Sequence, residues 1–336
     1  MKKIWSSWIT LIALVVVLAG CGSAGGNGSN ATSNSGTNEG SNATATSQGP
    51  ITIKHKYGEL TLDKPAVRVV ALEWTLTEDL VALGVQPVGS ADNENYKLWV
   101  SPEAALDSSV TDVGMRWEPN LEAIAALKPD LILSNSDNNT AIYEQLKAIA
   151  PTLEFNFYEG DGYNYDRMID VFNEIAKAVG KTDEAAKVIS DLDQHYAEAK
   201  QKLADAGKSD LHYVLTQAFT VQNAATLRLF ADNSVVAGTL TKIGMINDWK
   251  AEKHEAYGFD TKGIEALPAV QDSNFIYITQ KDDDVFGNAM KDNSVWKELD
   301  FVKENRLYAL DGTSWTFGGP ISSKVLVDQV VGELTK

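Results

Sequence analysis

Apolar and polar positions alternate in two ways from about residue 51 to the C-terminus. Short apolar runs such as "RVVAL" (68–72) and "LILSN" (131–135) have the composition of strands that are buried on both faces. The stretches between such runs repeat apolar residues every three or four positions, which is typical of amphipathic helices. Because strands and helices follow one another in turn, the pattern predicts an α/β fold with mainly parallel sheets.

The first half is expected to open with a hairpin and to continue with alternating strands and helices. Residues 51–65 alternate in polarity around Gly58, which favours a hairpin. For the helix that follows the first buried strand, Thr75 or Thr77 is the expected N-cap and Gly84 the stop. The further elements expected are a strand at 87–90, a helix at 120–130 capped by Asn120, a strand at 131–135, a helix at 141–150 and a strand at 151–157.

A long helical stretch interrupts this alternation between residues 165 and 205. Apolar residues recur at helical spacing from Met168 to Val179, and Gly180 marks a stop before a second helix. Two interpretations are open: a helical hairpin inside one domain, or a first helix that connects two α/β lobes. The second is favoured because strands and helices resume afterwards. They are expected as strands at 211–217, 226–230 and 274–280, helices at 234–245, 263–270 and 322–334, and a helix followed by a strand at 294–310.

A weak internal repeat supports two lobes of one design. The stretch "LVALGVQPVG" (80–89) resembles "LTKIGMINDW" (240–249) in its order of helix end, Gly and strand. We therefore expect two Rossmann-like lobes joined by one long α-helix, with a ligand cleft between them. The predicted boundaries are 51–163 for the N-terminal lobe, 164–186 for the connecting helix and 187–336 for the C-terminal lobe.

The N-terminus carries the features of a secretory signal. Lys2 and Lys3 precede an apolar run that ends in "LAGC", and Cys21 is the only cysteine of the chain. The last four residues of this run resemble the lipobox of bacterial lipoproteins, which implies removal of residues 1–20 and lipidation of Cys21. An uncleaved anchor is the alternative, and it would leave the same domain outside the membrane. Residues 21–50 are rich in Gly, Ser, Asn and Thr, so we expect a disordered tether.

Composition narrows the possible partners. The formal net charge of −17 argues against nucleic acid and leaves no broad basic face for anionic lipid, so contact with the membrane is expected through the lipid alone. A chain this acidic repels anions at long range, and an anionic ligand would need a local cluster of positive charge. With a single cysteine there is no disulfide framework, so stability is expected from core packing.

The folded part resembles the iron-siderophore solute-binding lipoproteins of Gram-positive ABC importers. The stretches that carry the resemblance are "RVVALEWTLTEDLVALGVQPVG", "DVGMRWEPNLEAIAALKPDLILS", "LRLFADNSVVAGTLTKIGM" and "GTSWTFGGPISSKVLVDQV". The pair Glu73-Trp74 resembles the branch that handles ferric citrate and citrate-derived hydroxamates. The resemblance implies a monomeric receptor, lipid-anchored on the extracellular face of the cell membrane, that delivers a ferric siderophore to an ABC permease.

Arginine is the side chain best suited to such a ligand, because its donors pair bidentately with carboxylate or hydroxamate oxygens. Arg116 and Arg228 each fall in a family-like stretch near a strand end, one in each half, and matching family positions commonly line the cleft. The alternative is surface pairing of Arg116 with Asp112 or Glu118, and of Arg228 with Asp232. Arg306 is a further candidate for ligand contact.

Aromatic and acidic residues complete the candidate site. The aromatic candidates are Trp74, Trp117 and Trp315, with Tyr96 and Trp99 either at the cleft rim or in the core. Glu73 is expected to bind a ligand hydroxyl, to orient an arginine or to cap a helix. Glu122 and Glu265 lie at equivalent places of the repeat, and the resemblance implies that they dock to the permease. A glutamate near a helix N-terminus is also favoured by the helix dipole alone.

Other functions find less support. The four histidines, His55, His195, His212 and His254, lack the spacing of a zinc or manganese site. Haem or cobalamin binding on the same fold remains an alternative, with Tyr163, Tyr165 and Tyr257 as the candidate ligands of haem iron. The sequence contains no G-x-S-x-G motif and no phosphate loop, so we do not expect an enzyme. A surface enzyme or adhesin on this scaffold is the alternative from another class.

Overall fold

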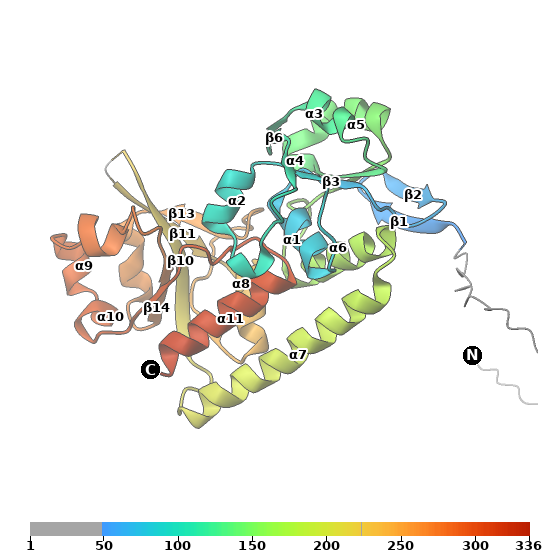
Figure 1. The fold of residues 1–336 in the computed structure, drawn as a ribbon. Helices are drawn as coiled ribbons and strands as arrows, with labels where there is room; N and C mark the ends of the chain where they lie inside the picture. Colours follow the sequence, from blue (N-terminus) through green and yellow to red (C-terminus); the bar gives the residue numbers. More distant parts are fainter. Residues whose placement is uncertain (1–48, 223) are drawn as a thin grey trace, which may run out of the picture. The chain divides into compact units, whose positions relative to one another are not determined.

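Two β-sheets organise the part of the chain that the computed structural model describes, residues 49–222 and 224–336 (Figure 1). These residues belong to one unit, Ser47–Lys336. The predicted signal peptide, Cys21 and most of the predicted tether lie outside the described residues. Below, each sheet and the helices that pack on it are called the N-terminal lobe and the C-terminal lobe.

The sheet of the N-terminal lobe is parallel throughout, with strand order β5-β4-β3-β8-β9. Its strands are β3 (Val69–Ala71), β4 (Gly89–Ser90), β5 (Thr111–Asp112), β8 (Leu131–Asn135) and β9 (Thr152–Phe155). The helices of this lobe are α1 (Trp74–Ala82), α2 (Asn93–Trp99), α3 (Leu121–Ala126), α4 (Ser136–Asn139) and α5 (Tyr143–Ile149), with short 3-10 turns at Pro102–Ala104 (η1) and Thr140–Ile142 (η2). Two small hairpins flank the sheet, β1 (Ile51–His55) with β2 (Gly58–Leu62) and β6 (Gly114–Met115) with β7 (Glu118–Pro119).

The sheet of the C-terminal lobe is mixed, with strand order β13-β11-β10-β14-β15 and β12 beside β10. β10 pairs in parallel with β12 and β14, and β14 with β15, whereas β10–β11 and β11–β13 are antiparallel. The strands are β10 (His212–Val221), β11 (Ala224–Phe230), β12 (Ile246–Asn247), β13 (Phe259–Lys262), β14 (Asn274–Ile278) and β15 (Leu307–Leu310). The helices are α8 (Val235–Lys242), η3 (Ile264–Val270), the π-turn η4 (Val285–Ala289), α9 (Ser294–Glu298), α10 (Asp300–Lys303) and α11 (Pro320–Leu334).

Two long helices separate the strands of the first sheet from those of the second along the chain. α6 (Tyr165–Ala178) packs against β1, α1 and α8, and α7 (Thr182–Asp205) packs against α11 (Figure 1). Gly180 has a φ of +67° between them, a left-handed conformation that glycine adopts without strain. The predicted stop at Gly180 is confirmed. The lobe boundaries at 163 and 186 stay predictions.

One hydrophobic cluster joins the two lobes. Its buried members include Leu133 of β8, Phe172 of α6, Ile276 of β14 and Val327 of α11. Gly238 of α8 lets this helix approach α6, because a Cβ on Gly238 would lie 2.7 Å from the Cβ of Tyr165. The lobes therefore share a packed interior in addition to their covalent connection.

A buried glutamate of α1 also holds the beginning of α11. Glu78 accepts hydrogen bonds from the backbone N–H of Gly319 (3.0 Å) and Ser322 (2.7 Å), and from the Ser322 hydroxyl (2.6 Å). A Cβ at Gly319 would collide with Oδ1 of the neighbouring Asp79. Helix α11 therefore approaches two carboxylates of the N-terminal lobe through a segment that must lack side chains.

The predicted α/β class with two lobes is confirmed, and local signals explain most of its elements. Asn120 caps α3 by accepting from the Ala123 N–H at 3.0 Å, as expected. The expected cap of α1 is wrong, because the helix begins at Trp74 and the side chain of Glu73 caps it. The Thr75 hydroxyl instead donates to the Phe317 carbonyl (2.7 Å), and that of Thr77 bonds the Ser90 hydroxyl (2.8 Å).

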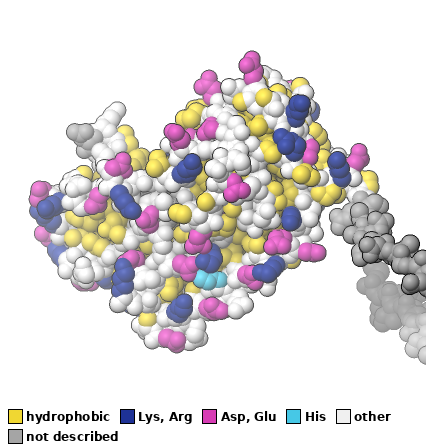
Figure 2. Space-filling view, in the orientation of Figure 1, with side chains coloured by type: hydrophobic (Ala, Val, Ile, Leu, Met, Phe, Trp, Pro, Cys, Tyr) yellow, Lys and Arg dark blue, Asp and Glu magenta, His cyan; other side chains and the backbone are white. Residues whose placement is uncertain are grey.

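Charged side chains of both signs are interspersed on the face shown in Figure 2. Among the described residues, no helix combines the length and the apolar character that crossing a membrane requires. The same residues contain no cluster of three or more His, Cys, Asp or Glu side chains arranged to hold a metal ion.

Candidate functional site

A cavity of about 340 Å³ receives side chains from both lobes. In the N-terminal lobe, its lining comes from segments that follow the carboxyl ends of the parallel strands β3, β8 and β9, where ligands of open α/β sheets usually bind. The β6–β7 hairpin adds two more side chains. The lining residues are Glu73, Arg116, Trp117, Asn135, Asp137, Asn138, Tyr158, Arg228, Tyr257, Phe259, Trp315 and Phe317. We call this space the cleft cavity.

Arg116 is placed by the turn of the β6–β7 hairpin. Its Nη1 donates to Glu73 Oε1 at 2.7 Å, and its Nε lies 3.9 Å from Oδ2 of Asp92. The guanidinium carbon lies 3.7 Å from the centre of the Trp74 ring, in cation–π geometry. Among the described residues Arg116 forms ion pairs with neither of the expected alternative partners, Asp112 and Glu118, and Asp112 instead accepts from the backbone N–H groups of Asn93 and Gly114.

Glu73 joins three parts of the N-terminal lobe. Besides Arg116, its carboxylate accepts from the Trp74 N–H that begins α1 (3.0 Å) and from Nδ2 of Asn138 after β8 (3.0 Å). Glu73 is only 5% exposed, and burying a charge is tolerated when it is paired and hydrogen-bonded, as here. Two of its three expected roles, capping a helix and orienting an arginine, are therefore present together.

Arg228 reaches the cavity from β11 of the C-terminal lobe. Its Nη1 donates to Oε1 of Gln217 on β10 at 2.9 Å, and its guanidinium lies 5.0 Å from the ring centres of both Phe219 and Phe259. Burial lowers the pKa of Arg228 below its usual value. No ion pair joins Arg228 to an acidic residue within the described ranges, and the expected alternative partner, Asp232, pairs with Lys250 at 2.6 Å.

Aromatic rings form much of the remaining wall. Trp117 is 56% exposed, whereas Trp315 packs edge-on against Trp74 with ring centres 5.1 Å apart. The ring centres of Tyr158 in the N-terminal lobe and Tyr257 in the C-terminal lobe lie 4.5 Å apart. The two lobes therefore meet at one side of the cavity through these rings.

Six lining residues were not among the sequence candidates for ligand contact: Asn135, Asp137, Asn138, Tyr158, Phe259 and Phe317. Tyr257 was a candidate only as a ligand of haem iron. Asn135 ends the buried strand "LILSN", and Asp137 and Asn138 follow it, so the end of a predicted parallel strand was a usable signal. Phe317 lies two residues after Trp315 in the same loop. Phe259 and Tyr158 give no local signal, because tertiary structure alone brings them to the cavity.

Four candidates do not line the cavity. Trp74 is 3% exposed, and its ring contacts the guanidinium of Arg116 instead of the cavity. Tyr96 is buried and donates to the Ala104 carbonyl at 2.7 Å, and Trp99 packs on the same cluster. Arg306 pairs with Glu304 and donates to the carbonyls of Gln271, Asp272 and Ser273. Arg306 thus holds the turn before β14.

The two docking candidates are exposed in the structure. Glu122 lies in the first turn of α3, and Glu265 in the first turn of η3, a 3-10 helix. Glu265 also accepts from the Gly263 N–H at 3.2 Å. Both glutamates are therefore positioned at helix starts, one on each lobe, as the repeat predicts.

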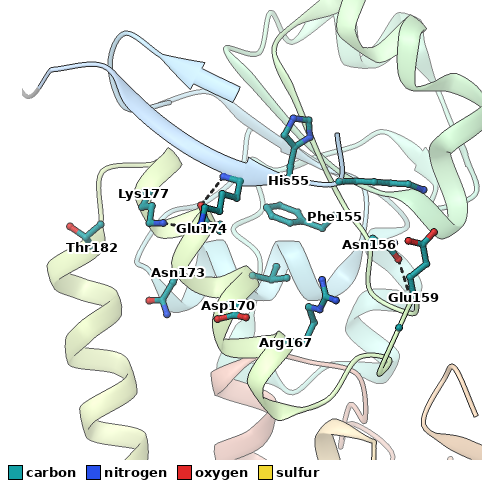
Figure 3. Close-up of a pocket in the computed structure, with 14 residues that line it drawn as sticks. His55, Phe155, Asn156, Glu159, Arg167, Asp170, Asn173, Glu174, Lys177 and Thr182 are labelled. Atoms are coloured by element: carbon teal, nitrogen blue, oxygen red, sulfur yellow. Dashed lines mark hydrogen bonds and ion pairs between the residues drawn. The ribbon is translucent and has the colours of Figure 1, made fainter. Parts of the chain in front are cut away.

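A larger cavity, about 950 Å³, lies between β1, the end of β9 and α6 (Figure 3). Its lining mixes basic and acidic side chains, and Glu174 is already bound to Lys177 (2.7 Å) and to the Lys54 N–H (2.9 Å). Arg167 points into it from α6 (Figure 3). It receives no side chain from the C-terminal lobe, whereas the cleft cavity is shared by both lobes.

Comparisons with known proteins agree with this architecture. A model of the family described as periplasmic binding protein matches residues 69–313. The probable siderophore-binding lipoprotein YfiY of Bacillus subtilis (strain 168) is 30% identical, with 98% of both chains covered. The Fe(3+)-citrate-binding protein YfmC of the same organism is 30% identical, with 83% of this chain and 84% of the relative covered.

Among solved structures, the Fe3+-Desferal-bound siderophore binding protein FhuD from Vibrio cholerae has a TM-score of 0.72 and 26% identity. It covers 80% of this chain and 98% of its own. The family consists of solute-binding proteins, and its matched region contains the lining residues of the cleft cavity from Glu73 to Phe259, with Arg116 and Arg228 among them. The predicted resemblance is thereby confirmed: this chain belongs to the periplasmic binding protein family.

Proposed function

We propose that the chain captures a ferric siderophore in the cleft cavity and delivers it to the permease of an ABC importer. The observation that carries this proposal is the cavity shared by both lobes. Arg116 of one lobe and Arg228 of the other line it together with aromatic side chains. Ferric iron prefers oxygen ligands, and a siderophore supplies these itself. The protein then needs hydrogen-bond donors for the oxygen shell and apolar surface for the spacers, and this cavity offers both.

The relatives support the same class of ligand, since their names refer to siderophores and to Fe(3+)-citrate. The relative YfiY is described as a lipoprotein, which supports lipidation of Cys21 and a location on the outer face of the cell membrane. The permease would be met through Glu122 and Glu265, which stand exposed on separate lobes. Because the lobes share a packed core and a helical connection, loading would involve a small closure rather than a wide hinge motion.

Intrinsic fluorescence tests the capture step, because Trp117 and Trp315 line the cavity and bound ferric iron quenches nearby indoles. Titration with ferric hydroxamates and ferric citrate should give saturable quenching at one ligand per chain. Mass spectrometry of the released ligand should show it unchanged, which separates a receptor from an enzyme. Saturation by haem or cobalamin, with no response to any ferric complex, would overturn the proposal.

A further inference from the structure

The cleft cavity contains arginines but no surplus of positive charge. Its two arginines, Arg116 and Arg228, are matched by two carboxylates, Glu73 and Asp137. The charged groups behind this lining add no positive excess either, since Asp92 lies beside Arg116 and both Lys56 and Glu159 act on Asp137. The local excess of positive charge that the sequence suggested for an anionic ligand is therefore not present.

The two arginines also differ in how much of their charge a ligand would meet. Arg116 is neutralised by Glu73 at 2.7 Å, and Glu73 is fixed by two further donors, so this pair behaves as one neutral unit. Arg228 is bound to the neutral amide of Gln217 and keeps its charge. An anion entering the cavity meets one available guanidinium and the Asp137 carboxylate, inside a chain whose net charge is −17.

Apolar surface dominates the remaining lining. Aromatic side chains supply half of the residues around the cavity: Trp117, Tyr158, Tyr257, Phe259, Trp315 and Phe317. Asn135 and Asn138 add neutral amides. Rings and amides suit a ligand that combines hydrogen-bond acceptors with methylene chains, and they offer little to a compact cluster of carboxylates.

We infer that the cleft cavity selects neutral ferric hydroxamates over anionic ferric citrate complexes. Three hydroxamate groups each lose one proton on chelation, so together they cancel the charge of Fe(III), whereas ferric citrate retains ionised carboxylates. A neutral complex enters without a charge penalty, and its oxygens accept from Arg228, from the remaining donors of Arg116 and from the asparagines. This inference rests on the proposed function and names its ligand class.

The test compares two ferric complexes of different charge by fluorescence titration. The neutral probe is ferric desferrioxamine with its terminal amine acetylated, and the anionic probe is ferric citrate. We expect the Kd of the neutral complex to be at least about tenfold lower than that of ferric citrate, because only ferric citrate brings an uncompensated charge into the cavity. Its affinity should change less than about threefold between about 50 and about 500 mM NaCl, because a neutral ligand has no charge for salt to screen.

A charge variant gives a second readout. Glu73→Gln keeps an acceptor for the Trp74 N–H but removes the carboxylate that neutralises Arg116. The variant should therefore bind ferric citrate more tightly, and the ratio of the two Kd values should fall about tenfold. Glu118→Gln is the matched control, since it removes an exposed carboxylate of β7 outside the cavity lining. Ferric citrate binding as tightly as the neutral probe to the unaltered protein would overturn the inference and leave the proposed function standing. If neither complex binds, both the inference and the proposed function are contradicted.

Discussion

Arg116 donates to Glu73 at 2.7 Å while its guanidinium carbon lies 3.7 Å from the centre of the Trp74 ring, so two neighbours hold the arginine at the cleft cavity. These contacts fix the side chain before any ligand arrives, which lowers the entropy that binding must overcome. They also make Arg116 part of the fold. Arg228 has no such ion pair among the described residues, so the two arginines should respond differently to removal.

Replacement of Arg228 by Ala should weaken ferric-ligand binding with little effect on stability. The variant loses charged donors to the ligand, worth roughly 1.5–3 kcal/mol or about 10- to 100-fold in Kd. It loses one hydrogen bond, to Gln217, and it removes a partly buried charge. Fluorescence titration and urea unfolding measure the two effects.

Arg167→Ala is the control for that experiment, because Arg167 is a half-buried arginine that lines the other cavity. Its loss should leave the affinity unchanged. An equal fall in affinity in both variants would assign the effect to general electrostatics rather than to contact at the cleft.

Replacement of Arg116 by Ala should lower both affinity and stability. The carboxylate of Glu73, which is only 5% exposed in the unaltered protein, would lose its ionic partner, and we expect this loss to cost about 1–3 kcal/mol of unfolding free energy. The double variant Arg116→Ala/Glu73→Gln should recover much of that stability and none of the affinity. Full stability in the single variant would show that Glu73 does not depend on Arg116.

Asp79 makes stability depend on pH. Both of its oxygens lack a hydrogen-bond partner within the described residues, and burial and the adjacent Glu78 raise its pKa well above the usual range. Burial also raises the pKa of Glu78 to about 7. A carboxyl whose pKa is raised by folding binds more protons in the folded state, so its stabilisation is complete below the ordinary carboxyl pKa and is lost as pH rises through the raised pKa, which for Glu78 is about 7.

Asp79→Asn should therefore stabilise the protein at pH 8 by roughly 1–3 kcal/mol and by less at pH 5. Urea unfolding at the two pH values measures the difference, with Asp193→Asn on the exposed side of α7 as the control. Equal effects at both pH values would mean that Asp79 does not carry this proton linkage.

Charge reversal at the docking candidates should separate transport from binding. Glu122→Lys with Glu265→Lys should abolish uptake of labelled ferric ligand by cells, because both glutamates are proposed to meet positive charge on the permease. The Kd should not change, since neither residue lines the cleft cavity. Glu184→Lys, an exposed glutamate in the first turn of α7, serves as the control and should transport normally.

Local signals made much of the fold predictable. Buried parallel strands leave apolar runs, and caps such as Asn120 act over three residues, so both can be read from short windows. The cap of α1 was missed because the role of Glu73 depends on Arg116 and Asn138, which lie 43 and 65 residues away along the chain.

The site was predictable where strand ends and motif position point to it, as for Arg116, Arg228 and the Trp315 loop. Arg306 shows the limit of that reasoning. It has the same chemistry as Arg228, yet three backbone carbonyls at 271–273 surround it, an arrangement that only the folded turn creates. The charge balance of the cavity was likewise inaccessible, because it depends on Glu73 and Asp137 meeting the arginines in space.

Anomalous diffraction at the iron edge tests the central claim most directly. Crystals of the protein grown with a ferric hydroxamate should show one iron peak in the cleft cavity, between Arg116 and Arg228 and beside Trp315. An iron peak in the cavity next to α6 instead, or ordered ligand that contacts neither arginine, would contradict the assignment of this site.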